Sequence, residues 1–418
     1  MEQVIAGVGF EVVQFLVLLT TYLLSTHRAS ESWSFHSLAV KSAFLMALYS
    51  KSSFSRLPTA EKVLRQKCWL CLVYNDRLMS VAFGRPGLIQ PSYSTCDFPP
   101  EDLDELPPLH VTRVIASLSL LHFKASITLS TIVADFAETL NHESLRNVPS
   151  PSASAIISRT VLLLERLSEW RSNLPKSLQM VDRDDLPDLK LSGKGELYST
   201  RFRIFLSLRY LTSRVLFYRP LLDLHLELEP HEYLLVNSEP LGDIMLTLLK
   251  DCAKSCRLVI DIAKGVLRAS GEGVNIQGAW WLSAHFVFNA SLVLLGINLA
   301  MRQSGDISSH SWVTTALIEN RNSVSDAVAV KRGLDRGNAV IARCRNALVR
   351  LAKSYDASDS LPGPDVAMLN REQGPSSSSQ TGQDAQHEVD NYLPLDYNFD
   401  ELASYSNFNF FSDPPHLY

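Results

Sequence analysis

The fold of this chain is decided by the stretch WLCLVYNDRLMSVAFGRP, which occupies residues 69–86. The stretch begins with apolar residues at helical spacing, passes through the adjacent charged pair Asp76 and Arg77, and ends in Gly84-Arg85-Pro86. A glycine after the last helical turn and a proline soon after it are signals that a helix stops. We therefore expect one helix over residues 60–84 and a sharp turn directly after it.

The charged pair predicts an architectural role for this helix. Neighbouring residues of a helix point to different sides, so Asp76 and Arg77 cannot pair well with each other. The candidates to neutralise Asp76 are Arg65, Lys67 or a residue of another helix. Thr59 is placed to cap the start of the helix. Our hypothesis is a buried hub whose ion pairs fix the register of neighbouring helices.

Helical periodicity continues along most of the chain, and alternating strand patterns with tight hairpin turns are missing. The predicted fold class is all-α, with one large irregular helical domain and a disordered C-terminal tail. About 350 residues exceed the usual size of a single core, so a division into two packed subdomains near residues 145–195 is plausible. The expected helices cover residues 10–25, 35–49, 60–84, 110–141, 153–173, 196–221, 241–269, 277–302 and 335–354.

Composition argues against direct nucleic-acid binding by this chain. The formal net charge is −5, and no run of Lys and Arg is dense enough to grip phosphates. The two basic clusters, 62–67 and Lys331-Arg332, fit a solvated helix face or a loop better.

No catalytic or metal-binding constellation is recognisable, so we do not expect an enzyme, and no cofactor is expected in this chain. The six cysteines indicate reduced thiols in an intracellular protein. Cys68 and Cys71 lie in the middle of a helix and Cys252 and Cys256 in another, which favours core packing over redox or zinc chemistry. Isolated histidines, including His36, His122 and His285, are expected to be satisfied or on the surface.

Two apolar stretches, residues 4–25 and 280–301, are long enough to cross a bilayer. Both contain polar residues, among them Glu11 and His285, and helices of this kind also occur buried inside large helical domains. A helical membrane protein is therefore the least favoured alternative.

The C-terminal end has a different composition. Residues 361–391 include a Ser/Gln-rich segment without apolar anchors, which predicts a flexible linker. Residues 392–418 combine aromatic side chains with four acidic residues and contain no Lys or Arg. This is the composition of an amphipathic activation segment, and the alternative is a tail that folds back onto the domain. The aromatic residues assigned to activation are Tyr397, Phe399, Phe408, Phe410 and Phe411.

The chain resembles the fungal-specific transcription factor domain, the middle regulatory region of fungal zinc-cluster transcription factors. In that family a helix with basic and aromatic residues leads to Asp-Arg, then to Gly-Arg-Pro. A later helix ends in Arg-Pro, which Arg219 and Pro220 match. The first part of the resemblance rests on Arg65, Trp69, Asp76, Arg77, Gly84, Arg85 and Pro86. The resemblance covers roughly residues 10–300 and assigns both apolar stretches to core helices.

The chain departs from the family pattern in two places. The family often has Gly-Leu-His after the second helix, where this chain has Ala47-Leu48-Tyr49. Family members normally begin with a zinc cluster of six cysteines that contacts DNA, and the six cysteines here lack its paired spacing. The domain at residues 1–360 is thus expected to be N-terminally truncated relative to the family, with zinc present only if such a cluster lies upstream.

The resemblance implies a nuclear regulator of transcription by RNA polymerase II in a fungus. Its expected partners are the transcription machinery or a coactivator, through the tail, and a homodimer or heterodimer of related factors. DNA would be reached only through a missing segment or a partner, and no membrane is involved. The alternative is a cofactor without DNA binding that titrates related factors.

Overall fold

The computed structural model describes residues 9–25, 28–99, 113–145, 151–188, 194–227, 240–269, 280–303, 311–334 and 339–359. Within these ranges the regular secondary structure is helical and contains no strand, which confirms the predicted all-α class. The α-helices are α2 (Phe10–Ser25), α3 (Ala29–Leu45), α4 (Thr59–Phe83), α5 (Arg113–Leu145), α6 (Ala153–Ser172), α7 (Lys194–Glu227), α9 (Pro240–Ala269), α10 (Trp280–Gln303), α11 (Ser311–Leu334) and α12 (Ala339–Asp359).

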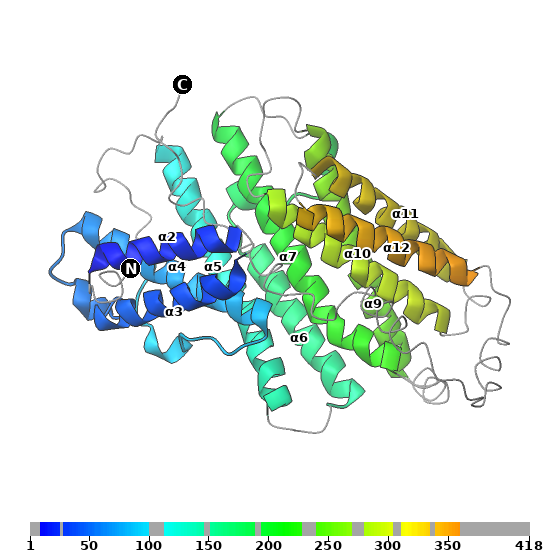
Figure 1. The fold of residues 1–418 in the computed structure, drawn as a ribbon, viewed down its shortest axis with the longest axis horizontal. Helices are drawn as coiled ribbons and strands as arrows, with labels where there is room; N and C mark the ends of the chain where they lie inside the picture. Colours follow the sequence, from blue (N-terminus) through cyan, green and yellow to red (C-terminus); the bar gives the residue numbers. More distant parts are fainter. Residues whose placement is uncertain are drawn as a thin grey trace, which may run out of the picture.

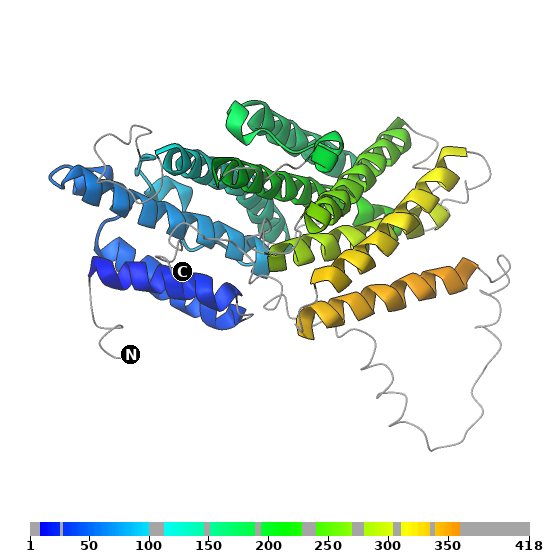
Figure 2. The same cartoon turned by 90° about the horizontal axis from the view of Figure 1, so that it is seen from above.

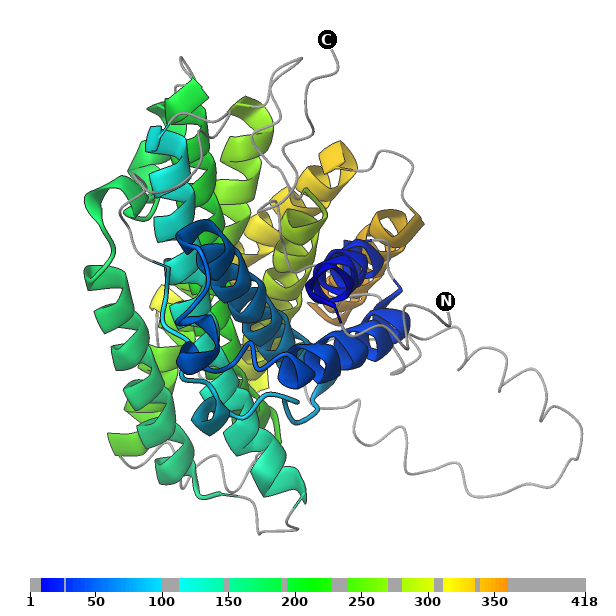
Figure 3. The same ribbon diagram turned by 90° about the vertical axis from the view of Figure 1, so that its left-hand side faces the viewer.

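The helices follow one another across the molecule roughly in chain order (Figure 1). The antiparallel pair α2 and α3 packs on α4 at one end, as Figure 3 shows from that side. The long helices α5, α6 and α7 cross the middle, and α9 to α12 form the other end (Figure 2). Helix α7 contacts α5, α6, α9 and α10, so it is the central support of the fold.

Two hydrophobic cores meet on α5. The N-terminal core, built from α2, α3 and α4, includes Leu120, Phe123 and Ile127 of α5. The main core, which extends to α12, includes Leu118 and Leu129 of the same helix. Residues 120, 123 and 127 share one helical face, whereas 118 and 129 lie on another, so α5 serves both cores at once. The boundary between the cores therefore lies upstream of residues 145–195.

Several helix limits differ from the expected ones, and one helix was missed. Helix α7 continues through Pro220 to Glu227 instead of ending at residue 221. Helix α11 was not predicted because its buried face carries Asn320 and Lys331 besides Val324 and Ala327, which interrupts the apolar periodicity. The prediction that Lys331 belongs to a solvated face or a loop was wrong, since its side chain is buried.

The described parts of the two apolar stretches form helices that pack inside the protein. By length and composition, two helical segments pass as membrane spans, Ile115–Ala137 and Ser283–Arg302. In the second, 72% of the apolar window is buried inside the protein, as in a core helix. The first expected stretch falls on α2, whose Val13, Leu16 and Leu24 are buried in the N-terminal core.

The end of α3 explains one departure from the family pattern. Helix α3 stops at Leu45, earlier than expected, and Ala47 adopts a φ of 51°. Its left-handed backbone lets Leu48 N donate to Ala43 O at 3.0 Å, which satisfies a carbonyl of the last turn. Glycine reaches this conformation without the steric cost that a Cβ brings, which accounts for the family's glycine here.

Ala47→Gly is therefore expected to stabilise the protein. Removing the Cβ from a left-handed residue should raise the free energy of unfolding by about 1 kcal/mol, net of glycine's larger unfolded-state entropy. Chemical denaturation of the purified chain measures the change. Ala43→Gly, inside α3, is the matched control and should destabilise. A loss of stability in Ala47→Gly would contradict the account.

Candidate functional site

The candidate site is built on α4, which is buried on most of its surface. Trp69 is fully buried and donates from Nε1 to Ser94 Oγ at 2.9 Å. Its ring packs edge-on against Phe44 of α3, with ring centroids 5.6 Å apart. Trp69 thus joins α3, α4 and the segment after the turn.

The carboxylate of Asp76 is the centre of the site. It is 1% exposed and receives three hydrogen bonds. Oδ1 accepts from Leu88 N at 3.0 Å and Oδ2 accepts from Ile89 N at 2.9 Å. His36 Nε2, on α3, donates to Oδ1 at 3.2 Å. Asp76 therefore joins α3, α4 and the chain after Gly-Arg-Pro, and we call these four residues the Asp76 junction.

The Gly-Arg-Pro turn brings the two donor amides to Asp76. Gly84 ends α4 in the left-handed conformation, with φ at 59°, and both its amide and that of Arg85 point back to Ser80 O. Ser80 Oγ in turn donates to Arg85 O at 2.5 Å. A Cβ on Gly87 would lie 2.9 Å from Asp76 Oδ2, so only glycine permits this approach. Arg85 and Pro86 are exposed, so they shape the turn from outside.

The remaining charges of α4 do not neutralise Asp76. Arg77 donates to Thr131 Oγ1 on α5, which confirms that the adjacent pair turns to different sides. Arg65 donates to Glu61 and lies 4.9 Å from the centre of the Phe10 ring. Of the three candidates to partner Asp76, Arg65 binds Glu61 instead, whereas a residue of another helix, His36, does contact the carboxylate, together with two backbone amides.

Two other predictions have separate outcomes. Thr59 is the first residue of α4 rather than its cap, because Pro58 occupies the cap position without a side-chain hydrogen bond. Arg219 and Pro220 lie on α7, inside the helix rather than at its end. The tail residues Tyr397, Phe399, Phe408, Phe410 and Phe411 lie outside the described residues.

The side chains of the site favour a structural role over redox or metal chemistry. Burial raises the pKa of the Cys68 thiol to about 12 and raises the pKa of the Cys71 thiol well above its usual value, so neither thiol supplies a thiolate near neutral pH. Among the described residues, no group of three His, Cys, Asp or Glu side chains could hold a metal ion. Three hydrogen bonds to one buried carboxylate instead fix the position of two helices and a turn.

The sequence could not indicate His36 as a partner of Asp76. The two residues are 40 positions apart, and the interpretation of His36 was only that of a satisfied or surface histidine. The two backbone donors carry no side-chain signal at all. The Gly-Arg-Pro motif was the usable signal, because it marks where the chain must turn back.

Comparison with known proteins agrees with this geometry. Residues 8–175, which contain the Asp76 junction and its turn, match the sequence model of the fungal specific transcription factor domain. Over these residues the chain is similar to that domain. The match confirms the resemblance drawn from the Asp-Arg and Gly-Arg-Pro motif.

Similar curated proteins are named as transcription factors. Transcription factor FBD3 of Gibberella moniliformis is 24% identical over 412 residues, which cover 98% of this chain and 53% of the relative. Transcription factor FBD3 of Fusarium pseudograminearum is 27% identical over 85% of this chain and 46% of its own length. Sorbicillinoid biosynthetic cluster transcription factor 2 of Penicillium rubens is 24% identical over 74% of this chain and 43% of its own.

The chain spans about half the length of these first two curated relatives. No solved structure matches this chain.

Proposed function

We propose that this chain is a non-catalytic regulator of transcription by RNA polymerase II in a fungal nucleus. The observation that carries the proposal is the fungal specific transcription factor domain at residues 8–175, together with relatives named as transcription factors. The helical domain serves as the regulatory scaffold. DNA is reached through a segment outside these 418 residues or through a partner, because the chain has a net charge of −5 and no basic patch in its sequence.

The C-terminal residues 392–418 are proposed as the activating segment. Their aromatic side chains supply apolar contacts for a coactivator groove, and their four acidic residues keep those side chains soluble. The tail's partner is accordingly a coactivator or another component of the transcription machinery. The domain's own partner is a second copy or a related factor.

A reporter assay tests the activating segment. The full chain is fused to a foreign DNA-binding module, and its output is compared with that of the same fusion lacking residues 392–418. We expect the deletion to remove most of the reporter output. Replacing Phe408, Phe410 and Phe411 with alanine should reproduce much of the loss, because the apolar contacts are removed while the acidic residues remain.

The control for this assay deletes residues 374–391, the polar segment directly before the tail. Its output should stay near that of the full fusion when protein levels are equal. Unchanged output after removal of 392–418 contradicts the activating role of the tail. The titrating cofactor would instead be favoured if the tail activates in the fusion but the unfused chain gives no output from the promoter of a related transcription factor.

A further inference from the structure

An arginine and a row of aromatic rings line the place where the two cores meet. On α7, Phe202, Phe205 and Arg209 lie at spacings of three and four residues, on one face of the helix. The ring of His122, on α5, stacks on Phe202 with centroids 4.4 Å apart and an interplanar angle of 17°. The guanidinium of Arg209 lies 4.8 Å from the centre of the Tyr74 ring on α4. We call these five residues the arginine–aromatic seam.

Arg209 carries a buried charge for which the described part of the chain shows no acidic partner. The residue is 8% exposed, and its Nη1 is buried without a hydrogen-bond partner. Two other arginines that lie against aromatic rings have partners: Arg65 binds Glu61, and Arg214 binds Ser255 and two tyrosine hydroxyls. A buried guanidinium without an acceptor is costly, whereas an anion beside it recovers strong, bidentate hydrogen bonds.

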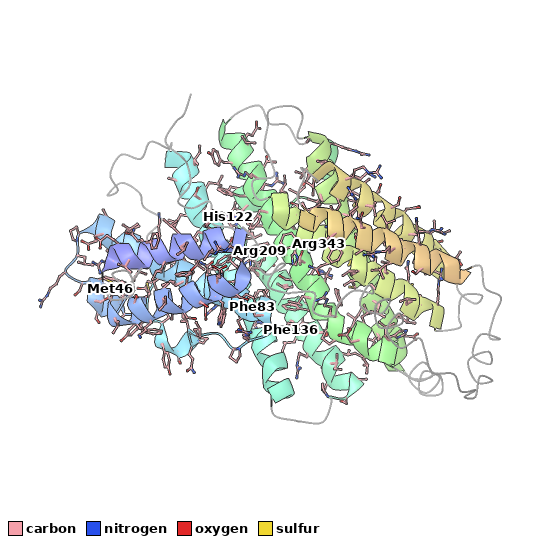
Figure 4. The ribbon with its side chains drawn as sticks, viewed as in Figure 1. Met46, Phe83, His122, Phe136, Arg209 and Arg343 are labelled. Carbon is pink, nitrogen blue, oxygen red and sulfur yellow. The ribbon has the colours of Figure 1, made fainter. Side chains whose placement is uncertain are left out.

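The seam places an apolar row of rings beside a buried charge. The rings of Phe202 and Phe205 are only half-buried, so part of each is open to contact. Arg209 lies 6.0 Å from the centre of the Phe205 ring, at the end of the row. Figure 4 labels His122 and Arg209 in the same central region, and the ring of Phe205 lies near both side chains. The site thus touches α4, α5 and α7, the helices that join the two cores.

We propose that the arginine–aromatic seam binds a small organic anion, with a carboxylate held by Arg209 and a planar apolar body against Phe202 and Phe205. The guanidinium fork matches a carboxylate, and the flat rings favour a planar partner. Burial lowers the pKa of Arg209 to about 9, so the side chain remains charged at neutral pH. This inference rests on the proposed function for its meaning, since the anion would be the effector of the regulatory domain.

Thermal unfolding of the purified full chain tests the site with sodium benzoate as the probe. Sodium chloride at equal ionic strength provides the baseline, and sodium acetate tests the carboxylate without the planar body. We expect a saturable rise in Tm with benzoate and a smaller one with acetate. Arg209→Leu should abolish the response, measured against the variant's own baseline.

Arg65→Leu is the matched control, because Arg65 also lies on an aromatic ring but has its carboxylate partner. It should respond to benzoate as the wild type does. Arg209→Lys keeps the charge without the planar fork and should raise the half-saturating benzoate concentration severalfold. If Arg209→Leu does not fold, the test of the proposal is the half-saturating benzoate concentration of Arg209→Lys.

Two results would overturn the proposal: no saturable rise in the wild type, or an equal rise in the Arg209 variants. Both are measured without a reporter, so they leave the transcriptional role of the chain untouched. Conversely, a silent tail in the reporter assay would leave the benzoate response in place. The two proposals therefore fail separately.

Discussion

Asp76→Ala is expected to lower the free energy of unfolding by roughly 3–5 kcal/mol, because several hydrogen-bond donors lose one buried acceptor. The amides of Leu88 and Ile89 would remain buried or half-buried without a partner, and His36 would lose its contact from α3. Chemical denaturation of the purified chain, followed by circular dichroism at 222 nm, measures the change. The loss should appear as a lower midpoint.

Asp97→Ala is the matched control for this experiment. Asp97 follows the same turn, but its side chain is 57% exposed and its partner Lys51 is also exposed. Exposed pairs contribute about 0–1 kcal/mol, so this variant should stay close to the wild type. Asp76→Asn keeps the shape of the side chain but removes its charge. One of its ends would then be an NH2 group facing a backbone N–H donor, so this variant should also be less stable than the wild type. A shift at Asp76 no larger than that at Asp97 would show that the junction does not hold the turn.

The Asp76 junction shows what the sequence could predict about the site. The helix, its end at Gly84 and the divergence of Asp76 and Arg77 follow from local rules, which short motifs carry. The partners of Asp76 do not follow from local rules, because two are backbone amides and one is a histidine 40 residues away. Contacts of this kind depend on how helices pack, which spacing along one helix cannot specify.

The same limit explains the missed helix α11. Its inward face contains Asn320 and Lys331, and each is buried for a reason that lies on another helix. Asn320 Nδ2 donates to Asn298 Oδ1 of α10 at 2.8 Å, and Lys331 Nζ donates to a backbone oxygen of the same helix. Periodicity of apolar residues identifies a helix only when its buried face is apolar. The predicted all-α class is correct despite this missed helix, because the other long helices show helical periodicity of apolar residues.

Lys331→Met is expected to leave the protein as stable as the wild type at pH 7, or to raise the free energy of unfolding by about 1–3 kcal/mol. The wild-type side chain is 1% exposed, and its Nζ donates to Ala284 O at 3.0 Å and lies 5.1 Å from the centre of the Phe288 ring. Burial lowers the pKa of Lys331 to about 8. Methionine keeps much of the length and removes the buried charge.

The pH dependence gives this prediction its sign. An unfolded lysine has a pKa of about 10.4, so between pH 8 and that value the unfolded chain binds more protons than the folded one. The contribution of Lys331 to stability therefore rises with pH across this window, and its penalty is complete below pH 8. Lys331→Met removes this dependence, so any advantage of the variant should shrink as the pH rises from 8 to about 10.4.

Urea denaturation of both proteins at pH 7, 8, 9 and 10 measures the difference directly. Lys254→Met is the matched control, because Lys254 is 69% exposed and pairs with Asp251 on the same helix. Its difference from the wild type should be small and should not follow the Lys331 pattern. A Lys331→Met protein that is clearly less stable at pH 7, with a deficit constant in pH, would mean that the bond to Ala284 outweighs the buried charge. The buried lysine would then be a stabilising contact between α10 and α11 rather than a cost that the packing of these helices tolerates.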